Sequence, residues 1–314
     1  MNRCPITYDE CGSARYSEAG LRVLSRRLTD LRSFPYSAAE QRREALRRAG
    51  KISIQGVQHK LSARLSIAGQ VFEIVDTHGR FILKPQHPDY PALPENEDLV
   101  MKLAATVGIE VPDHGLMYAS DDSMTYFIRR FDRVGQRDKV AVQDFASLAG
   151  RDRDTKYDWS IERLFDLLEY CTFPRVEEAE LLRRLLFNFL VGNEDMHLKN
   201  WAVITREGKT MLAPAYDFIS SGLAFLSIGR DRGEIEETAL PLAGKKKRLE
   251  RTHWIDYLAY ERLDLTEQAV GSLLDDLRRG LQGWEEIIRR TFLPEAMQDR
   301  FQGLVFDRVA ALGL

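Results

Sequence analysis

The spacing of the apolar residues changes near residue 135, and this change most constrains the fold. Before it, the segment Leu61–Ile67 alternates apolar with polar residues, which is the pattern of a half-buried strand. After it, apolar residues recur every three or four positions, as in Leu181–Leu190, which is the pattern of an amphipathic helix. The sequence therefore predicts an α+β protein with a β-rich lobe at 1–135 and an α-helical lobe at 136–314.

Local signals place individual elements within both lobes. Ser37 and Glu40 have the spacing of a capping box that opens a charged helix ending near Gly50. Gly108 stands where the C-cap of a later helix belongs. The other expected elements are strands at 61–67, 71–75 and 80–84, a proline-rich loop at 85–94, a helix at 99–107, two strands that flank 121–122, and helices at 161–168, 181–190 and 266–292.

Composition excludes several classes of protein. Apolar residues are 44 % and charged residues 30 % of the 314, and the net charge is −3, so no overall field favours nucleic acid or membrane. The most apolar stretch, 181–191, is interrupted by Arg183, Arg184 and Asn188, so no membrane span is expected. The absence of an apolar leader and the count of three cysteines favour the cytoplasm. The basic run 245–248 is either a solvated loop or a binding patch.

A polar loop after the apolar helix carries the strongest chemical signal. Asp195 and Asn200 have the D-x-x-x-x-N spacing of a kinase catalytic loop, in which the carboxylate orients an attacking hydroxyl and the amide oxygen reaches magnesium. Asp217 stands where a second metal-binding carboxylate belongs. Asp and Asn also favour turns. The joint pattern, which includes His197 and Lys199, favours the catalytic interpretation over a simple turn.

Upstream residues are candidates for binding the phosphates of ATP. Lys84 ends an apolar strand, where a kinase holds the lysine that contacts the α- and β-phosphates, and Glu97 is a candidate ion-pair partner. A solvated lysine and a first-turn glutamate favoured by the helix dipole are the structural alternatives. The segment Ser53–Lys60 is the candidate phosphate loop, because Gly56 allows close backbone approach and successive N–H groups can hold an anion. A polar connector is the alternative.

At these positions the chain resembles the HipA family of serine/threonine kinases, the toxins of bacterial toxin–antitoxin modules. The resemblance runs from about Ile52 to the C-terminus, and the short HipT-type toxins match best. The matching motifs are Ser53-x-x-Gly56-x-Gln58-x-Lys60, Phe81-Ile82-Leu83-Lys84, Asn96-Glu97, Arg130-Phe131-Asp132-Arg133, Gly192-Asn193-x-Asp195-x-His197-x-Lys199-Asn200 and Pro214-x-Tyr216-Asp217. The last two are the most specific. The resemblance implies a bilobal, protein-kinase-like fold.

The resemblance also implies roles for single residues. Asp195 is the expected catalytic aspartate, His197 and Lys199 shape its loop, and Asn200 and Asp217 hold Mg²⁺. Lys199 is also expected to stabilise the transferring phosphoryl group. The residues implied in ATP binding are Gln55, Gly56, Val57, Gln58, His59 and Lys60 around the phosphates, Lys84 with Glu97, Arg129, Arg130 and Phe131 at the adenine hinge, and Tyr216. Family members often have an acidic residue in place of Arg129, which leaves the role of this side chain open.

Regulation and partners follow from the same resemblance. Ser53 matches the loop serine that these kinases phosphorylate on themselves, and a dianion there should repel the ATP phosphates. About fifty residues precede this loop, whereas longer HipA-type toxins carry an extra N-terminal subdomain. In HipT-type systems a separate small protein resembles that subdomain and acts as the antitoxin, and a helix-turn-helix DNA-binding protein is the third component. Both are expected partners, and no direct contact of this chain with DNA is expected.

The expected reaction transfers the γ-phosphoryl group of ATP to a serine or threonine of a translation factor. By resemblance the target is an aminoacyl-tRNA synthetase, with the tryptophan enzyme favoured. Two alternatives remain open. A small-molecule kinase of the aminoglycoside-phosphotransferase type shares the D-x-x-x-x-N spacing and should show an acidic pocket for a cationic substrate. A pseudokinase should lack one of Lys84, Asp195, Asn200 and Asp217, and all four are present.

Overall fold

The protein consists of two compact units. A computed structural model describes residues 1–48, 58–135, 138–152 and 154–314. Unit 1 comprises residues 1–99, 112–138 and 290–294, and unit 2 comprises residues 100–111, 139–289 and 295–314. Both units are discontinuous in sequence.

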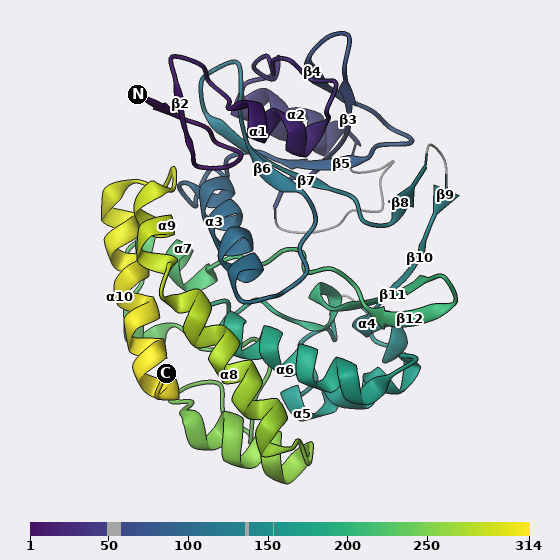
Figure 1. The fold of residues 1–314 in the computed structure, drawn as a ribbon, viewed down its shortest axis with the longest axis vertical. Helices are drawn as coiled ribbons and strands as arrows, with labels where there is room; N and C mark the ends of the chain where they lie inside the picture. Colours follow the sequence, from purple (N-terminus) through teal and green to yellow (C-terminus); the bar gives the residue numbers. More distant parts are fainter. Residues whose placement is uncertain (49–57, 136–137, 153) are drawn as a thin grey trace. The chain divides into compact units, whose positions relative to one another are not determined.

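Unit 1 is built on a five-stranded antiparallel sheet with the strand order β4-β3-β5-β7-β6 (Figure 1). Its strands are β3 (Leu61–Ser66), β4 (Val71–Ile74), β5 (Phe81–Lys84), β6 (His114–Tyr118) and β7 (Met124–Arg129). All five lie where the sequence predicted strands. β5 is the central strand, and its last residue, Lys84, pairs with Tyr126 of β7. The candidate phosphate-binding lysine therefore stands in the middle of the sheet.

Two helices contribute to a core shared with this sheet, α1 (Glu18–Leu24) and α2 (Ala38–Arg48). The predicted capping box is confirmed at α2, because the Ser37 N–H donates to the Glu40 carboxylate at 2.8 Å and the Glu40 N–H donates to Ser37 Oγ at 3.3 Å. The shared core includes Leu21, Leu24, Ala45, Leu61, Ala63, Phe72, Phe81, Leu83 and Phe127. Two short ladders complete the strands, β1 (Asn2–Arg3) with β2 (Glu10–Gly12), and β8 (Arg133–Val134) with β9 (Asp138–Lys139).

Helix α3 (Leu93–Thr106) follows the proline-rich loop. The loop predicted at 85–94 was too long by two residues, since the helix already includes Pro94. A proline is tolerated there because the N–H groups of the first turn have no partner within the helix. Gly108 has a φ of +80°, which confirms the predicted glycine cap.

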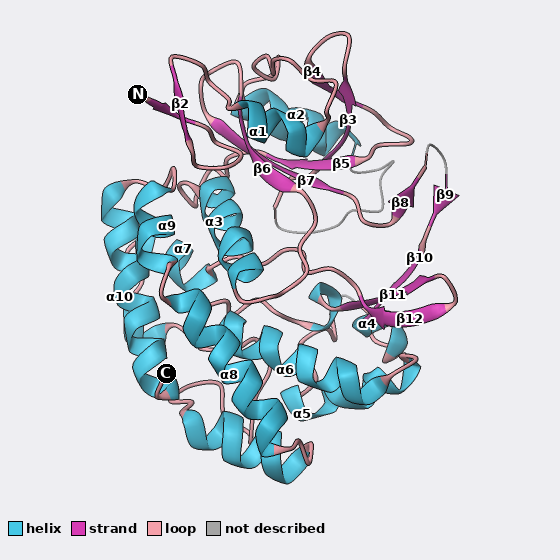
Figure 2. Ribbon diagram, in the orientation of Figure 1, coloured by secondary structure: helices cyan, strands magenta, loops and turns pink. Residues whose placement is uncertain are grey.

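Unit 2 is mainly helical (Figure 2). Its helical elements are α4 (Phe145–Leu148), α5 (Ile161–Leu164), the 3₁₀-helix η1 (Phe165–Tyr170), α6 (Pro174–Leu190), the 3₁₀-helix η2 (Leu198–Asn200), α7 (Ser221–Ser227), the 3₁₀-helix η3 (Arg232–Glu234), the π-helix η4 (Thr252–Arg262), α8 (Glu267–Leu281), α9 (Trp284–Arg290) and α10 (Glu295–Leu312). Among the described residues, no helix is both long and apolar enough to cross a membrane.

Two predicted helices of this unit were wrong in extent. The helix expected at 161–168 is α5 followed by η1, because apolar residues three apart suit a 3₁₀ turn as well as an α-helix. The helix expected at 266–292 is divided into α8 and α9 around Gly283, since glycine lowers helix stability. The helices η4 and α10 were not predicted.

A small antiparallel sheet lies within the otherwise helical unit 2, with the order β10-β11-β12. Its strands are β10 (Ala141–Asp144), β11 (Ala202–Arg206) and β12 (Lys209–Leu212). The sequence predicted an α-helical lobe, so these three short strands were not expected. The sheet has a functional consequence: β11 directly follows the candidate catalytic loop, and β12 leads towards Asp217.

The basic run 245–248 is bonded to its own chain. Lys246 Nζ lies 3.2 Å from the Glu236 carboxylate. Lys247 Nζ donates to the carbonyls of Gly233 and Glu234 at 2.8 and 2.9 Å. These contacts favour the solvated-loop interpretation over a binding patch.

Candidate active site

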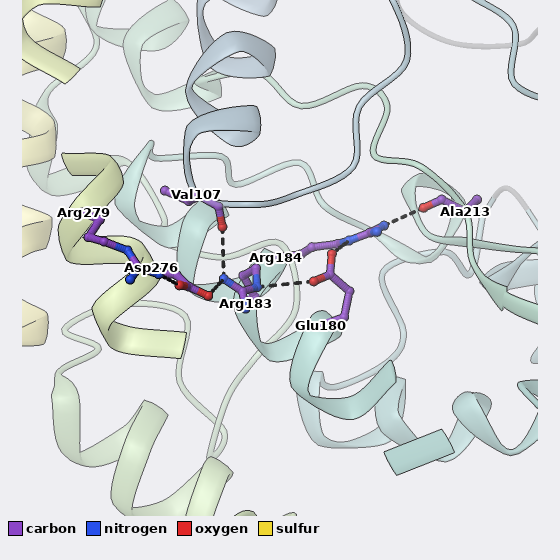
Figure 3. A network of polar contacts seen from close by, with 7 residues as sticks. All are labelled: Val107, Glu180, Arg183, Arg184, Ala213, Asp276 and Arg279. Carbon is purple, nitrogen blue, oxygen red and sulfur yellow. Dashed lines mark hydrogen bonds and ion pairs between the residues drawn. The ribbon is translucent and has the colours of Figure 1, made fainter. Parts of the chain in front are cut away.

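Arg184 is a buried cation within the apolar helix α6. Its Nε donates to Glu180 Oε1 at 2.7 Å, one helical turn earlier, and its Nη1 donates to the carbonyl of Ala213 at 2.6 Å (Figure 3). A buried charge persists only with partners of this kind. Ala213 begins the segment that leads to Tyr216 and Asp217, so α6 fixes the start of that segment.

The neighbouring Arg183 connects α6 to α8 and to Val107, the residue that follows α3. Its Nη1 donates to the carbonyl of Val107 at 3.0 Å and to Asp276 Oδ2 at 2.6 Å (Figure 3). Asp276 also pairs with Arg279 on α8. Burial alone would raise the pKa of Asp276, but the two arginines outweigh this effect, and the pKa is lowered. Helix α6 is therefore held rigidly behind the site.

The chain leaves α6 through a tight turn that places Asp195. Gly192 has a φ of +67°, and a Cβ there would lie 2.8 Å from the side chain of Leu304. The Asn193 side chain is buried, and its Nδ2 donates to Asn188 Oδ1 at 2.8 Å. Its Oδ1 in turn accepts the N–H of Asp195 at 3.2 Å. The two asparagines thus hold the backbone of the candidate catalytic residue.

Asp195 and Asn200 are joined by the loop itself. The Asn200 Nδ2 donates to the backbone carbonyl of Asp195 at 2.8 Å, and the His197 N–H donates to the same carbonyl at 2.9 Å. Because the amide nitrogen must face that carbonyl, the amide oxygen of Asn200 faces away from it. The Asp195 carboxylate is 52 % exposed, and its Oδ1 accepts the hydroxyl of Tyr157 at 2.6 Å.

Asp217 is held beside this loop by its neighbours. Its φ is +55°, a left-handed conformation that aspartate tolerates better than most residues and that often marks functional sites. The Tyr216 hydroxyl donates to the carbonyl of Lys199 at 3.0 Å, and burial and the charge of Asp217 raise the pKa of this phenol. Phe218 is buried and stacks on Phe187 of α6 with ring centroids 5.8 Å apart. Tyr216 therefore connects the candidate metal-binding segment to the candidate catalytic loop.

His197 lies beneath the catalytic carboxylate. Its Nε2 is 3.9 Å from Asp195 Oδ1, and its ring meets that of Tyr157 edge to face with centroids 5.1 Å apart. Burial lowers the pKa of His197, against the opposing effect of Asp195. The ring is thus a buried, neutral neighbour of Asp195, and the shape-holding role of His197 stays a prediction.

Glu194 was not predicted as part of the site. Its N–H donates to Ser221 Oγ at 2.7 Å, which ties the loop to the start of α7. Burial first, and then the charge of Glu236, raise the pKa of Glu194 to about 7, with Asp195 as a further contributor. A carboxyl group with a raised pKa therefore lies next to Asp195 in the sequence.

In unit 1 the predicted ion pair between Lys84 and Glu97 is confirmed. The two side chains are in direct contact and are 2 % and 1 % exposed. The Lys84 Nζ also lies 5.6 Å from the centre of the Tyr126 ring. Burial on this scale fixes the position of the ammonium group, as a phosphate-binding lysine requires.

The arginines predicted at the hinge form hydrogen bonds and ion pairs within unit 1. Arg129 Nε donates to Asp113 Oδ2 at 2.8 Å, and its Nη2 donates to two carbonyls at the end of α1. Arg130 forms a bidentate pair with Asp132 at 2.9 and 2.7 Å. The side chain of Arg129 therefore has partners within unit 1, and its part in ATP binding stays a prediction. Phe131 is partly buried at the end of this segment.

Part of the candidate phosphate loop can be located. Gln58, His59 and Lys60 are partly buried just before β3, and burial lowers the pKa of His59. Ser53, Gln55, Gly56 and Val57 lie outside the residues that the structure describes.

The donor set fits magnesium. Asn200 offers an amide oxygen whose orientation is fixed by its own nitrogen, and Asp217 offers a carboxylate on a constrained backbone. Magnesium takes hard oxygen ligands from one or two carboxylates and completes its shell with phosphate and water. In the described part of the chain, no group of three or more His, Cys, Asp or Glu side chains suited to a metal occurs.

The geometry defines a class of protein. A sheet with a buried Lys–Glu pair, together with a D-x-x-x-x-N loop and a following aspartate in a helical unit, describes a protein-kinase-like fold. A model of the "HipA-like C-terminal domain" family matches residues 52–284. The chain belongs to this family.

Relatives agree with this assignment. A Haemophilus influenzae protein named "Putative kinase" is 30 % identical over 243 residues, which are 70 % of this chain and 68 % of that protein. The "Serine/threonine-protein kinase toxin HipA" of Shewanella oneidensis is 27 % identical over 54 % of this chain and 43 % of its own length. The chain thus spans about two thirds of the first relative and less than half of the second.

Solved structures share the fold. A chain from the Shewanella oneidensis complex of HipA, HipB and operator DNA superimposes with a TM-score of 0.69 at 21 % identity, over 91 % of this chain and 74 % of that chain. The Helicobacter pylori kinase CtkA gives a TM-score of 0.53 at 16 % identity, over 74 % of this chain and 86 % of that one. At such identities the likeness concerns the fold alone.

Several residues of the site were missed by the sequence reasoning. They are Tyr157, Arg184, Asn188 and Glu194. For Arg184 and Asn188 a signal existed, because polar residues inside an apolar periodic helix require buried partners. For Tyr157 no local signal existed, since it lies 38 residues from its partner.

Proposed function

We propose that this chain is a serine/threonine protein kinase that transfers the γ-phosphoryl group of ATP to a protein hydroxyl. The proposal is carried by the arrangement of the catalytic loop. The Asn200 amide nitrogen is bonded to the Asp195 carbonyl at 2.8 Å, while the Asp195 carboxylate stays half exposed. This leaves one carboxylate for an acceptor hydroxyl and one amide oxygen for a cation.

Each residue has a defined task in this reaction. Asp195 orients the acceptor hydroxyl and takes its proton as the new O–P bond forms. Lys199 stabilises the charge on the transferring group, and His197 supports the loop. Lys84, positioned by Glu97, contacts the α- and β-phosphates. Magnesium, when bound by Asn200 and Asp217, supplies charge neutralisation at the phosphates.

The finer function follows from the family. We infer a toxin of a bacterial toxin–antitoxin system acting in the cytoplasm, with Ser53 as its autophosphorylation site. The Shewanella relative is named a toxin, and its homologue of known structure is in complex with HipB and DNA. The proposed partners are a small antitoxin that resembles the N-terminal subdomain of the longer HipA-type toxins and a helix-turn-helix DNA-binding protein. The proposed target is an aminoacyl-tRNA synthetase, with the tryptophan enzyme first.

Intact-mass spectrometry tests the reaction. The purified chain is first treated with phosphatase and then incubated with MgATP, alongside Asp195→Asn. The wild type should gain a phosphate that maps to Ser53, and the variant should gain it about 10²- to 10⁴-fold more slowly. MgATP affinity and melting temperature of the variant should stay close to those of the wild type, because the carboxylate is exposed.

Two results would count against the proposal. A wild type that takes up no phosphate and phosphorylates no protein would remove its basis. Phosphorylation of an aminoglycoside in place of a protein would favour the small-molecule kinase.

A further inference from the structure

Tyr157 makes a contact that the proposed reaction does not explain. Its hydroxyl donates to Asp195 Oδ1 at 2.6 Å. The Tyr157 hydroxyl is therefore hydrogen-bonded to the same carboxylate that is proposed to orient the hydroxyl group of the substrate. A hydroxyl ready to lose its proton to a general base lies about 2.6–3.2 Å from it, and Tyr157 meets this criterion.

Burial does not account for the position of the phenol. Tyr157 is 40 % exposed, and the Asp195 side chain is 52 % exposed. An exposed tyrosine gains little from the apolar packing of its ring. Its orientation is determined by the hydrogen bond and by the edge of the His197 ring, 5.1 Å away between centroids.

The backbone on both sides of Tyr157 is anchored at the site. The Leu198 N–H donates to the carbonyl of Lys156 at 3.3 Å, which ties the segment to the catalytic loop. The Asp158 N–H donates to the carbonyl of Thr155 at 3.0 Å and closes a turn around Tyr157. The Lys156 Nζ lies 4.8 Å from the centre of the Tyr157 ring. The phenol is thus presented to Asp195 by a turn that belongs to the same unit.

The phenol remains a hydrogen-bond donor under ordinary conditions. Burial and the neighbouring Asp195 carboxylate both raise the pKa of Tyr157. A neutral hydroxyl is the form in which a serine or threonine acceptor also approaches the base.

We propose that the Tyr157 hydroxyl occupies the acceptor position on Asp195, so that Tyr157 determines which hydroxyl groups reach the catalytic carboxylate. The inference rests on the proposed kinase function. A serine or threonine of a protein substrate has to displace the phenol before it can be phosphorylated. A water molecule has to do the same, so Tyr157 also suppresses the hydrolysis of ATP in the absence of an acceptor.

The position also makes Tyr157 an internal acceptor. In that step the Tyr157 oxygen bonds to the γ-phosphorus and the bond to the β–γ bridging oxygen of ATP breaks. The phenol proton passes to Asp195, and ADP leaves. Once Asp195 has released this proton to solvent, a phosphotyrosine dianion lies beside a carboxylate, and repulsion would drive it away from the site.

The decisive experiment uses water as the acceptor. ADP release from MgATP is measured without a protein substrate for the phosphatase-treated full chain, Tyr157→Phe and Tyr170→Phe. Tyr170 is the matched control, an exposed phenol of unit 2 at 49 %. Phenylalanine at 157 retains the ring contact with His197 and removes only the hydroxyl, so the fold should persist, as a melting curve checks.

Tyr157→Phe should raise kcat for hydrolysis about three- to tenfold, the change expected when one hydrogen bond to a half-exposed carboxylate no longer competes. The KM for ATP should not change, and Tyr170→Phe should behave as wild type. The double variant Tyr157→Phe/Asp195→Asn should lose the gain. Peptide mapping that finds phosphate on Tyr157 in the wild type would support the same placement directly.

Two outcomes would overturn the inference. An unchanged rate in Tyr157→Phe would mean that the hydroxyl blocks nothing, and a lowered kcat would make Tyr157 a positioning residue for Asp195. Failure of the kinase proposal itself has a different signature. In that case the wild type and Tyr157→Phe would both show neither hydrolysis nor phosphate on Ser53, and the inference would fall with it.

Discussion

The two units hold the charged groups of the candidate site in opposite ways. In unit 1 the ion pair of Lys84 with Glu97 is buried. Asp98 in the same unit is fully buried, with His114 Nδ1 at 2.8 Å and the hydroxyl of Tyr8 at 2.7 Å. In unit 2 the Asp195 carboxylate is half exposed, and the side chain bonded to it is an exposed phenol.

The comparison separates two properties of an active-site group: how firmly its position is fixed, and how easily a substrate can reach it. A buried ion pair fixes its groups strongly, since loss of one partner leaves the other charge in a medium of low dielectric. A half-exposed carboxylate contributes little to stability and remains open to a substrate. Unit 2 obtains its rigidity from neutral and ionic contacts behind the loop, such as Arg184 with Ala213 and Asn188 with Asn193.

The largest effect on stability should follow from breaking the buried pair. Lys84→Met leaves the Glu97 carboxylate buried without its cation, and the free energy of unfolding should fall by about 3–5 kcal/mol. Urea denaturation measures this change. Asp195→Asn neutralises a charge in the exposed setting and should alter the same quantity by less than about 1 kcal/mol.

A double variant makes this contrast sharper. Lys84→Met/Glu97→Leu removes both charges and should recover more than half of the loss, because an apolar pair of similar volume fits a buried site. Equal losses in Lys84→Met and Asp195→Asn would show that the two units do not differ in the way described.

The support behind the catalytic loop should come next in size. Arg184→Met leaves the Ala213 carbonyl buried without its donor, and the free energy of unfolding should fall by about 2–3 kcal/mol. The KM for MgATP should rise as well, since Ala213 begins the segment that carries Asp217. Denaturant unfolding and steady-state kinetics measure the two effects.

Arg175→Met is the matched control on the same helix. The Arg175 side chain is 68 % exposed, pairs with Glu178 and donates to the carbonyl of Leu263 at 2.7 Å. Its loss should cost about 0.5 kcal/mol or less. A similar cost for both arginines would argue against a buried support at Arg184.

The turn at Gly192 offers a smaller and separable effect. Gly192→Ala places a methyl group 2.8 Å from Leu304 on a backbone with a φ of +67°, and should cost about 2 kcal/mol. Gly208→Ala has a similar φ of +75° with no atom within 4 Å, so it should cost only the backbone term of about 1 kcal/mol. Thermal unfolding of both variants measures the extra loss of stability that the steric clash causes at Gly192. If Leu304 moves aside, the two variants should lose the same stability.

The features that could be predicted from the sequence depend on residues that lie close together in the chain. The capping box at Ser37 and Glu40 depends on residues three apart, and the five strands of unit 1 depend on alternation within each segment. The Lys84–Glu97 pair spans only thirteen residues between a strand and the next helix. Such local patterns sufficed to predict most of unit 1 after residue 58.

The unpredicted features depend on distant residues. Arg184 meets a carbonyl 29 residues away, and Tyr157 meets Asp195 across 38 residues. The sheet of β10, β11 and β12 combines short strands from both sides of the catalytic loop. Arg184 and Asn188 were read only as evidence against a membrane span, whereas their burial in an apolar helix is a direct sign of a polar network.

The smallest effect concerns Glu194, the one carboxyl group of the catalytic loop that burial influences strongly. Its pKa is raised from 4.5 to about 7, so the folded state binds a proton more tightly than the unfolded chain does. The free energy of unfolding should therefore fall as the pH rises from about 4.5 to about 7 and level off above that. Because Glu194 is only partly buried, the expected fall is about 1 kcal/mol.

Glu194→Gln removes this titration and should be more stable than the wild type at pH 8 but not at pH 4. Urea unfolding at the two pH values measures the difference, and Glu261→Gln on the exposed side of η4 corrects for the loss of one charge. Equal pH dependence in Glu194→Gln and the wild type would mean that solvent reaches Glu194 as it reaches Asp195. The contrast between buried charge in unit 1 and exposed charge in unit 2 would then extend to every carboxylate of the catalytic loop.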